Sequence, residues 1–193
     1  MPWEKRFDVD QTLNRAMEAF WAHGFEATSM QDLVDATGVN RASLYATYGD
    51  KRDLFLAALR KYDSGVRHRL LEELAARELP LGAIAAVFDK FIDQVTRPSG
   101  NWGCFLINSA LELAPHDQEV ADLVNGAQDD IEAFFLAMIR KGQNQGAVSS
   151  GLDARELARA GLVSLLGLVV MIRSRPDGEY LNAIRDGFLA RLT

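Results

Sequence analysis

The sequence has few of the residues that mark several classes of protein. Its 193 residues include a single cysteine, which excludes an internal disulfide framework and a cysteine-rich zinc site. The three histidines stand far apart in the sequence. Glu112, His116 and Asp117 lie near one another, but this spacing is weak evidence for a metal. We therefore expect neither a metal nor a cofactor.

A long hydrophobic run and an excess of positive charge are also missing. The most apolar run, from Ala160 to Ile172, is too short to span a bilayer, and the first residues lack the apolar region of a signal peptide. We expect a cytoplasmic protein without a membrane partner. The formal net charge is −6, and the first 55 residues carry nine acidic and six basic side chains. Any binding to DNA must therefore come from a few well-placed groups and be sensitive to salt.

Helical periodicity is present along most of the chain, and no segment shows the alternation of a β-strand. Asp8 is a typical N-cap and Gly24 a typical end for the first helix. Its apolar residues repeat every three or four positions: Leu13, Ala16, Met17, Phe20 and Trp21. The pattern predicts an all-α protein with about nine helices.

Two short helices follow the first one. Thr28 with Gln31 fits a capping box that opens the second helix, and Gly38 ends that helix. Asn40 is a good N-cap for a third helix, from Arg41 to about Tyr48. Two short helices joined by a glycine-containing turn of three or four residues are typical of a helix-turn-helix.

The rest of the chain predicts longer helices. Asp50 caps the fourth helix, which we expect to reach about Leu79, where Pro80 closes it. The later helices are expected over Leu81–Thr96, Gly103–Ala114, from Asp117 to about Asn144, Asp153–Ser174 and Gly178–Leu192. We expect a DNA-binding domain over residues 1–50 and a second domain over residues 51–193.

Three motifs in the first part of the chain resemble the TetR family of repressors. They are residues Gly24–Met30, Gly38–Tyr45 and Tyr48–Phe55, in this order within a match over about residues 8–56. The resemblance implies a three-helix DNA-binding domain and a C-terminal helical domain for ligand binding and dimerisation. Thr47 departs from the family, which often has histidine there, and Val34 and Thr37 partly replace its usual small pair.

The second helix of a helix-turn-helix enters the major groove with its N-terminal residues against base edges. Arg41 is placed to read guanine or hold a phosphate, and Ala42 to contact a thymine methyl group. Ser43 is placed for a base or a phosphate, Tyr45 for a groove contact and Thr47 for a phosphate.

Phosphate contacts are also expected where helices begin. Thr28 and Ser29 lie at a helix N-terminus, which favours an anion, although one of the two hydroxyls is needed as a cap. By resemblance Lys51 holds a phosphate. For Arg52 a phosphate contact and a solvated surface position are equally open.

The C-terminal helices have a wide apolar face with small residues that permit close helix approach. By resemblance we expect two helices of each subunit to form a four-helix dimer interface, although this face also packs against its own domain. The expected interface residues are Leu157, Gly161, Ser164, Leu165, Leu168, Met171, Ile184 and Phe188.

Aromatic and methionine residues lie on the helices that enclose the ligand cavity in the family, although such residues are more often plain core. The sensor candidates are Phe88, Phe91, Trp102, Cys104, Phe105, Phe134 and Met138. No cluster of charge inside the apolar faces points to a charged ligand. The Gly103-Cys104 pair resembles family members with Gly-Cys at the start of helix six, some of which sense electrophiles or oxidants. A helix N-terminus lowers the pKa of a thiol; an inert buried thiol is the alternative.

Together these features predict a homodimeric transcriptional repressor bound to palindromic, double-stranded operator DNA. Release would follow when the C-terminal domain binds a small-molecule inducer or senses an electrophile or oxidant. The alternative is a small-molecule-binding protein or an enzyme without DNA binding. Against it, the sequence has no nucleophile elbow, no phosphate-binding glycine loop and no zinc motif. The inducer, the operator sequence and the choice between repressor and activator stay open.

Overall fold

Capping interactions set the helix boundaries at the start of the chain. In the computed structural model, which describes residues 7–77, 79–96 and 102–193, Asp8 Oδ1 accepts a hydrogen bond from the Gln11 N–H at 3.0 Å. Gly24 ends this helix with φ 87°, a conformation that suits glycine. Asn40 caps the third helix by accepting from the Ser43 N–H at 2.9 Å. These boundaries confirm the sequence predictions.

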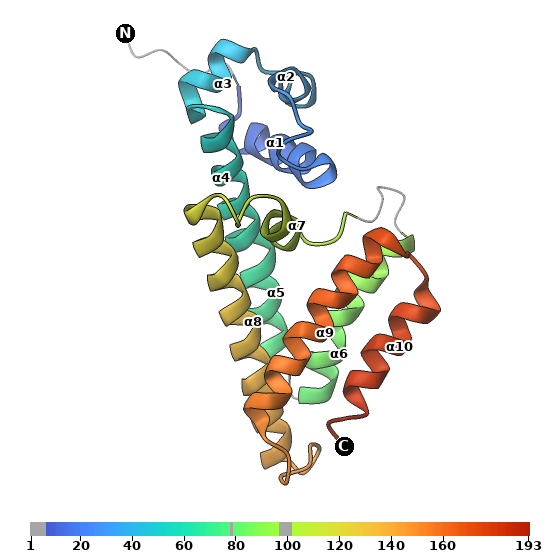
Figure 1. The fold of residues 1–193 in the computed structure, drawn as a ribbon. Helices are drawn as coiled ribbons and strands as arrows, with labels where there is room; N and C mark the ends of the chain where they lie inside the picture. The colour runs from blue at the N-terminus through green and yellow to red at the C-terminus, as the bar shows by residue number, and fades with distance from the viewer. Residues whose placement is uncertain (1–6, 78, 97–101) are drawn as a thin grey trace.

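Within the described ranges every regular element is a helix (Figure 1). The elements are α1 (Val9–His23), α2 (Met30–Thr37), α3 (Arg41–Tyr48), α4 (Lys51–Tyr62), the π-helical turn η1 (Asp63–His68), α5 (Arg69–Ala75), α6 (Pro80–Ile92), the 3₁₀ turn η2 (Asp93–Thr96), α7 (Phe105–Glu112), α8 (Gln118–Asn144), α9 (Ala154–Ser174) and α10 (Gly178–Leu189). Because α4, η1 and α5 follow one another without a break, we count them as one helix. The described residues then form nine helices, as predicted.

The predicted fourth helix is wrong in two respects. Its middle is π-helical, and the run ends at Ala75, short of the predicted Leu79. Pro80 begins α6 instead of closing the preceding helix. Proline suits that position because the first N–H of a helix has no intrahelical acceptor. The helix predicted from Gly103 begins two residues later, at Phe105.

The second helix also begins later than predicted. Ser29 is its N-cap: the hydroxyl accepts from the Asp32 N–H at 3.1 Å, and Asp32 Oδ2 accepts from the Ser29 N–H at 2.7 Å. Thr28 is 1% exposed, and its hydroxyl donates to the Gly24 carbonyl at 2.6 Å. The predicted capping box of Thr28 with Gln31 is therefore wrong.

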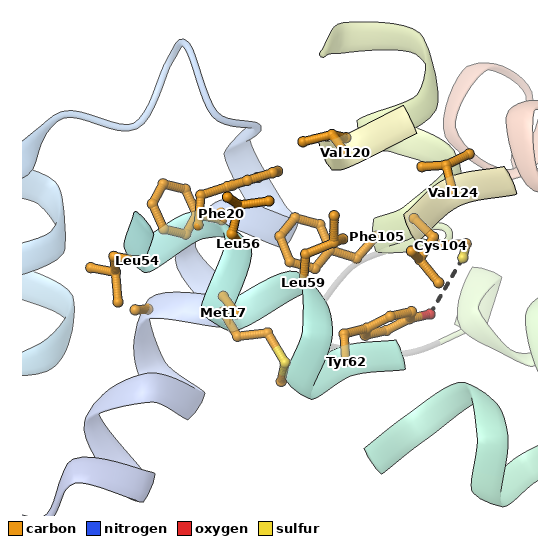
Figure 2. Close-up of a cluster of buried hydrophobic side chains, with 14 of the residues drawn as sticks. Met17, Phe20, Leu54, Leu56, Leu59, Tyr62, Cys104, Phe105, Val120 and Val124 are labelled. Carbon is orange, nitrogen blue, oxygen red and sulfur yellow. Dashed lines mark hydrogen bonds between the residues drawn. The ribbon is translucent and has the colours of Figure 1, made fainter. Parts of the chain in front are cut away.

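The helices form two groups that α4 connects (Figure 1). The first core cluster is formed by residues of α1–α4, and it also includes residues of α7 and of the start of α8, such as Phe105 and Val120 (Figure 2). The second cluster lies among α6, α8, α9 and α10. Phe55 of α4 packs edge-on against Phe20 of α1, at 5.2 Å between ring centroids. The first cluster thus extends past residue 50, where we predict the domain boundary.

Among the described residues, α9 is the one helix that is both long and apolar enough to meet the criteria for a membrane span. Its 21 residues are long enough, and their mean hydropathy of 1.7 over 18 residues high enough, to cross a membrane by length and composition alone. Core helices of soluble proteins meet the same two criteria. Here α9 packs against α8, α10 and α6, and Leu165, Leu168 and Ile172 lie in the second core cluster. These contacts account for its apolar inner face.

Candidate DNA-binding surface and sensor cavity

The turn between α2 and α3 is fixed by hydrogen bonds and burial. Gly38 takes a left-handed conformation with φ 71°. The Thr37 hydroxyl donates to the Leu33 carbonyl at 2.6 Å and accepts from the Val39 N–H at 3.2 Å. Leu33 and Val39 are buried on either side of the turn. Thr37, a departure from the family pattern, therefore stabilises the turn that orients α3.

Helix α3 turns one side inward and offers the other to solvent. Leu44 is buried in the first core cluster, whereas Tyr45 is 43% exposed. Arg41 and Ala42 are exposed as well, and Arg41 forms no ion pair within the described ranges. Half-buried residues complete this face: Ser43 and Thr47. The structure thus leaves all five predicted α3 residues at least partly accessible to solvent.

Two of the three other predicted phosphate contacts are accessible. Ser29 is exposed at the start of α2, and Lys51 occupies the first position of α4, with Nζ 4.3 Å from the ring centroid of Phe25. Hydrogen bonds from Ser29 lower the pKa of Asp32, so a carboxylate also lies at this helix end. Thr28 is enclosed, and its hydroxyl is already bonded, so its side chain is not part of this surface.

Arg52 does not face the surface of α3. Its guanidinium donates to Asp117 from Nε at 2.6 Å and from Nη2 at 2.9 Å, and it donates to Glu119 at 3.2 Å. The hydrogen bonds from Arg52 lower the pKa of Asp117 to about 2. Asp117 also caps α8 through the Glu119 and Val120 N–H groups. Arg52 therefore ties α4 to the start of α8.

A second connection joins α7 to the loop between α1 and α2. The carboxylate of Glu112, the last residue of α7, accepts from the Phe25 N–H at 3.0 Å and from the Glu26 N–H at 2.8 Å. A Cβ on Gly24 would lie 2.8 Å from Glu112 Oε2, so glycine allows this close approach. No local sequence pattern could have predicted this contact, because 86 positions separate Glu112 from Glu26. Among the described residues, no group of three metal-ligating side chains exists.

A cavity of about 160 Å³ lies between the two core clusters. Its walls are mostly apolar and come from α1, α4 through α9 and the residues between them. The lining side chains include Trp21, Tyr62, Val66, Arg67, Leu70, Leu71, Val87, Lys90, Phe91, Gln94, Cys104, Leu106, Ile107, Val124 and Ile131. The C-terminal helices thus enclose a small apolar space that also touches α1.

Most predicted sensor residues do not line this cavity. Phe91 and Cys104 do. The others pack in the two core clusters or against another ring: Phe88, Phe134 and Met138 in the second cluster, Phe105 against Phe55 at 5.3 Å, and Trp102 against Trp21 at 5.5 Å between ring centroids. For Phe88, Phe105, Phe134 and Met138 the expectation of plain core is the better description, because each is buried in one of the two clusters.

The environment of Cys104 differs from the predicted one. It is the N-cap of α7, yet burial raises the pKa of its thiol, although a hydrogen bond donated by the Tyr62 hydroxyl at 3.5 Å acts in the opposite direction (Figure 2). The cost of desolvating a thiolate outweighs the favourable helix end. The lowered pKa expected from the helix N-terminus is therefore wrong, and the thiol is in its neutral form.

Arg67 is a buried charge that was not predicted from the sequence. It lies on η1, is 7% exposed, and donates from Nε to Asp63 and from Nη2 to Asp130 at 2.8 Å. Burial lowers the pKa of its guanidinium, but the hydrogen bonds to both carboxylates outweigh burial and raise it. The i, i+4 spacing of Asp63 and Arg67 was the available sequence signal. The structure thus adds a paired charged cluster at one wall of the cavity, where the sequence showed no cluster that points to a charged ligand.

The residues predicted for the dimer interface divide into two sets. Five pack inside the chain itself: Leu157, Gly161, Leu165, Leu168 and Phe188. A Cβ on Gly161 would lie 2.8 Å from Phe188 Cζ, so this glycine serves packing between α9 and α10 of the same chain. The other three, Ser164, Met171 and Ile184, are half-buried and line an open apolar groove with the exposed Val163 and Val170.

Family models match both parts of the chain. The model described as "Bacterial regulatory proteins, tetR family" matches residues 13–58, which include α2, α3 and most of α1 and α4. The model described as "Tetracyclin repressor-like, C-terminal domain" matches residues 80–188, from the start of α6 into α10. The second match alone covers more than half of the chain.

Whole-chain comparisons agree with these matches. The chain is 35% identical over 179 residues to an uncharacterised HTH-type transcriptional regulator, YezE of Bacillus subtilis (strain 168), with 92% of each chain covered. It is 30% identical to the HTH-type transcriptional repressor ComR of Escherichia coli (strain K12), covering 93% of this chain and 86% of that one. A cysteine mutant of the regulator CifR, solved with a 26-base-pair double-strand operator, superposes with a TM-score of 0.85 at 27% identity, covering 98% of each chain.

Proposed function

Because this chain belongs to the TetR family and is a DNA-binding transcriptional regulator, we propose that it is a dimeric repressor released from its operator by a small molecule. The observation that carries the proposal is the surface of α3. Arg41, Ala42 and Tyr45 are exposed together on this helix, whereas Leu44 is buried. The relatives are regulators, which argues against the alternative of an enzyme or ligand carrier without DNA binding.

In this proposal α3 reads base edges in the major groove. Arg41 donates to guanine or phosphate, Ala42 contacts a thymine methyl group, and Tyr45 contacts the groove wall. Ser43 reaches a base or a phosphate, and Thr47 reaches a phosphate. Lys51 and the exposed Ser29 hold phosphates at helix N-termini, where the dipole favours anions. Repression, as opposed to activation, is supported by the similarity to ComR, a transcriptional repressor.

Dimerisation supplies the second half-site. One short helix gives little affinity, so two copies of α3 are expected on a near-palindrome, about 34–36 Å or a multiple apart. We place the interface on the outward side of α9 and α10, along the groove of Ser164, Met171 and Ile184. Val163 is 66% exposed there and Val170 is 42% exposed. Burying this apolar strip against a second copy would remove it from water.

Helix α7 connects the cavity to the DNA-binding end of the molecule. Its first turn and N-cap line the cavity through Cys104, Leu106 and Ile107, and its last residue, Glu112, holds the backbone of the loop that precedes α2. A ligand that shifts α7 would alter the support of α2 and the spacing of the two α3 helices. Operator affinity would then fall, because the ligand binds this arrangement better. We favour a non-covalent ligand over electrophile sensing, since the Cys104 thiol is buried and neutral.

The test is selection from a random duplex library with the purified full chain, followed by fluorescence anisotropy on the selected DNA. We expect an inverted repeat, bound as a dimer, with affinity that falls steeply as salt rises. A folded chain that enriches no sequence would contradict the proposal. This function places the protein in the cytoplasm, where bacterial DNA lies.

A further inference from the structure

Two residues that line the cavity carry buried hydrogen-bond donors without a partner. Among the described residues, two buried side-chain polar atoms lack a hydrogen-bond partner: Trp21 Nε1 and Arg67 Nη1. Both are N–H donors, and both residues line the same cavity. Buried donors without partners are rare and cost free energy, so each calls for an explanation. A molecule that completes this site must bring a hydrogen-bond acceptor.

The charge around Arg67 argues against a charged ligand. Its guanidinium already donates to Asp63 and Asp130, and two carboxylates beside one guanidinium leave no net positive charge there. Lys90, the other cation of the lining, is exposed. A carboxylate in this cavity would lose its hydration and meet a site that is already neutralised. An uncharged acceptor avoids that cost.

The volume and the lining of the cavity indicate the size and the polarity of the ligand. An engineered apolar cavity of about 150 Å³ takes up benzene, and this cavity measures about 160 Å³. The volume therefore suits one ring with a small substituent. Its walls around Arg67 are aliphatic and aromatic: Val66, Leu70, Leu71, Val87, Phe91 and Ile131. Such walls favour an apolar ring.

We propose that the cavity binds an uncharged one-ring compound carrying a carbonyl oxygen, which accepts a hydrogen bond from Arg67 Nη1, with Trp21 Nε1 as the second donor. That binding of this compound releases the operator rests on the proposed function. Arg67 lies on the π-helical turn η1, and such turns are frequent at functional sites. Trp21 belongs to α1, so the bound compound also contacts the DNA-binding end of the molecule.

Matched probes test this assignment by isothermal titration calorimetry on the full chain without DNA. Acetophenone carries the ring and the carbonyl oxygen, ethylbenzene has the same carbon skeleton without an acceptor, and benzoate adds a charge. We expect acetophenone to bind at least about tenfold more tightly than ethylbenzene, because a hydrogen bond to a charged group is gained. Benzoate should bind more weakly than acetophenone. Equal binding of acetophenone and ethylbenzene, tighter binding of benzoate, or no binding of any probe overturns the proposal.

Variants test which N–H donor causes the preference for acetophenone over ethylbenzene. Arg67→Lys keeps the positive charge but removes the forked N–H groups, so the preference for acetophenone over ethylbenzene should disappear. Arg69→Lys makes the same change two residues later at an exposed position outside the lining, and should leave the preference intact. Thermal unfolding verifies that both variants fold. If Arg67→Lys does not fold, Trp21→Phe decides: it removes the second donor and should reduce the preference several-fold. An unchanged preference in the folded variant contradicts the role of that donor.

Operator binding separates this inference from the proposed function. A protein that binds its operator but shows no preference for acetophenone retains the regulatory function and refutes the ligand class. A protein that prefers acetophenone but binds no DNA retains the ligand class and refutes the regulatory function.

Discussion

The surface of α3 and the cavity are built in different ways. The α3 surface comes from one short segment, held by a cap at Asn40, a left-handed turn at Gly38 and the buried Leu44. The residues that line the cavity come from α1 and from α4 through α9. Side chains of α3 can therefore be exchanged without disturbing the cavity, whereas a change in the cavity reaches several elements, including α7 and α1.

The largest expected effect is on the α3 surface. Arg41→Ala and Tyr45→Ala should each weaken operator binding by tenfold or more, because each lost base contact costs about 1–3 kcal/mol and a dimer loses it twice. Both side chains are exposed, so the melting temperature should change little. Anisotropy titration and thermal unfolding measure the two effects.

Arg191→Ala is the control, since it removes an exposed arginine near the far end of the chain. Operator affinity equal to wild type in both the Arg41 and the Tyr45 variant would remove α3 as the reading element.

The contrast between the two regions explains how much the sequence could predict. Asp8, Asn40 and Asp50 act on N–H groups within three residues of themselves, so their caps were visible in the sequence. The contacts of Glu112 with Phe25 and Glu26 span more than 80 positions, and no local pattern reports them.

Cys104 shows the same limit on a single residue. Its place at the start of a helix was readable from the sequence and predicted a lowered pKa. Its burial depends on α4, α8 and the other helices packed around it, and burial determines the actual direction of the shift (Figure 2). Likewise, four predicted interface residues of α9 and Phe188 of α10 are buried inside the chain, because the apolar face of α9 packs against its own domain and also extends to the surface.

The second expected effect concerns the outward face of α9. Val163→Arg places a charge in the middle of the proposed interface and should convert the dimer to a monomer, with weaker operator binding because one half-site is lost. Sedimentation velocity gives the oligomeric state. Leu152→Arg, at an exposed apolar residue outside the groove, is the control and should stay dimeric. A dimeric Val163→Arg protein would locate the interface elsewhere.

A smaller effect is expected where the two regions meet. Glu112→Ala removes the acceptor of the Phe25 and Glu26 N–H groups, and should lower the free energy of unfolding by about 1–2 kcal/mol. That corresponds to a melting temperature several degrees lower for a chain of this size. The same variant should respond less to a cavity ligand in operator release. Glu73→Ala, at an exposed glutamate of α5, is the comparison. If both variants behave alike, Glu112 does not couple the regions.

The smallest effect is a pH dependence of the contact between α4 and α8. Arg52 holds the pKa of Asp117 at about 2 against an ordinary value of 3.8. Because the folded-state pKa is lowered, the stabilisation is present above pH 3.8 and disappears as the pH falls towards 2. Urea midpoints of wild type and Arg52→Gln should therefore differ at pH 6 and converge near pH 2. A gap that is independent of pH would show that Asp117 gains nothing from Arg52.

Dimethyl sulfate footprinting on the selected operator tests the central claim most directly, since this reagent attacks guanine N7 in the major groove. The wild-type protein should protect guanines in two half-sites about one helical turn or a multiple apart, and the Arg41→Ala, Tyr45→Ala double variant should protect neither. Protection of a single half-site, or protection that survives in the double variant, would contradict reading of the operator by paired α3 helices.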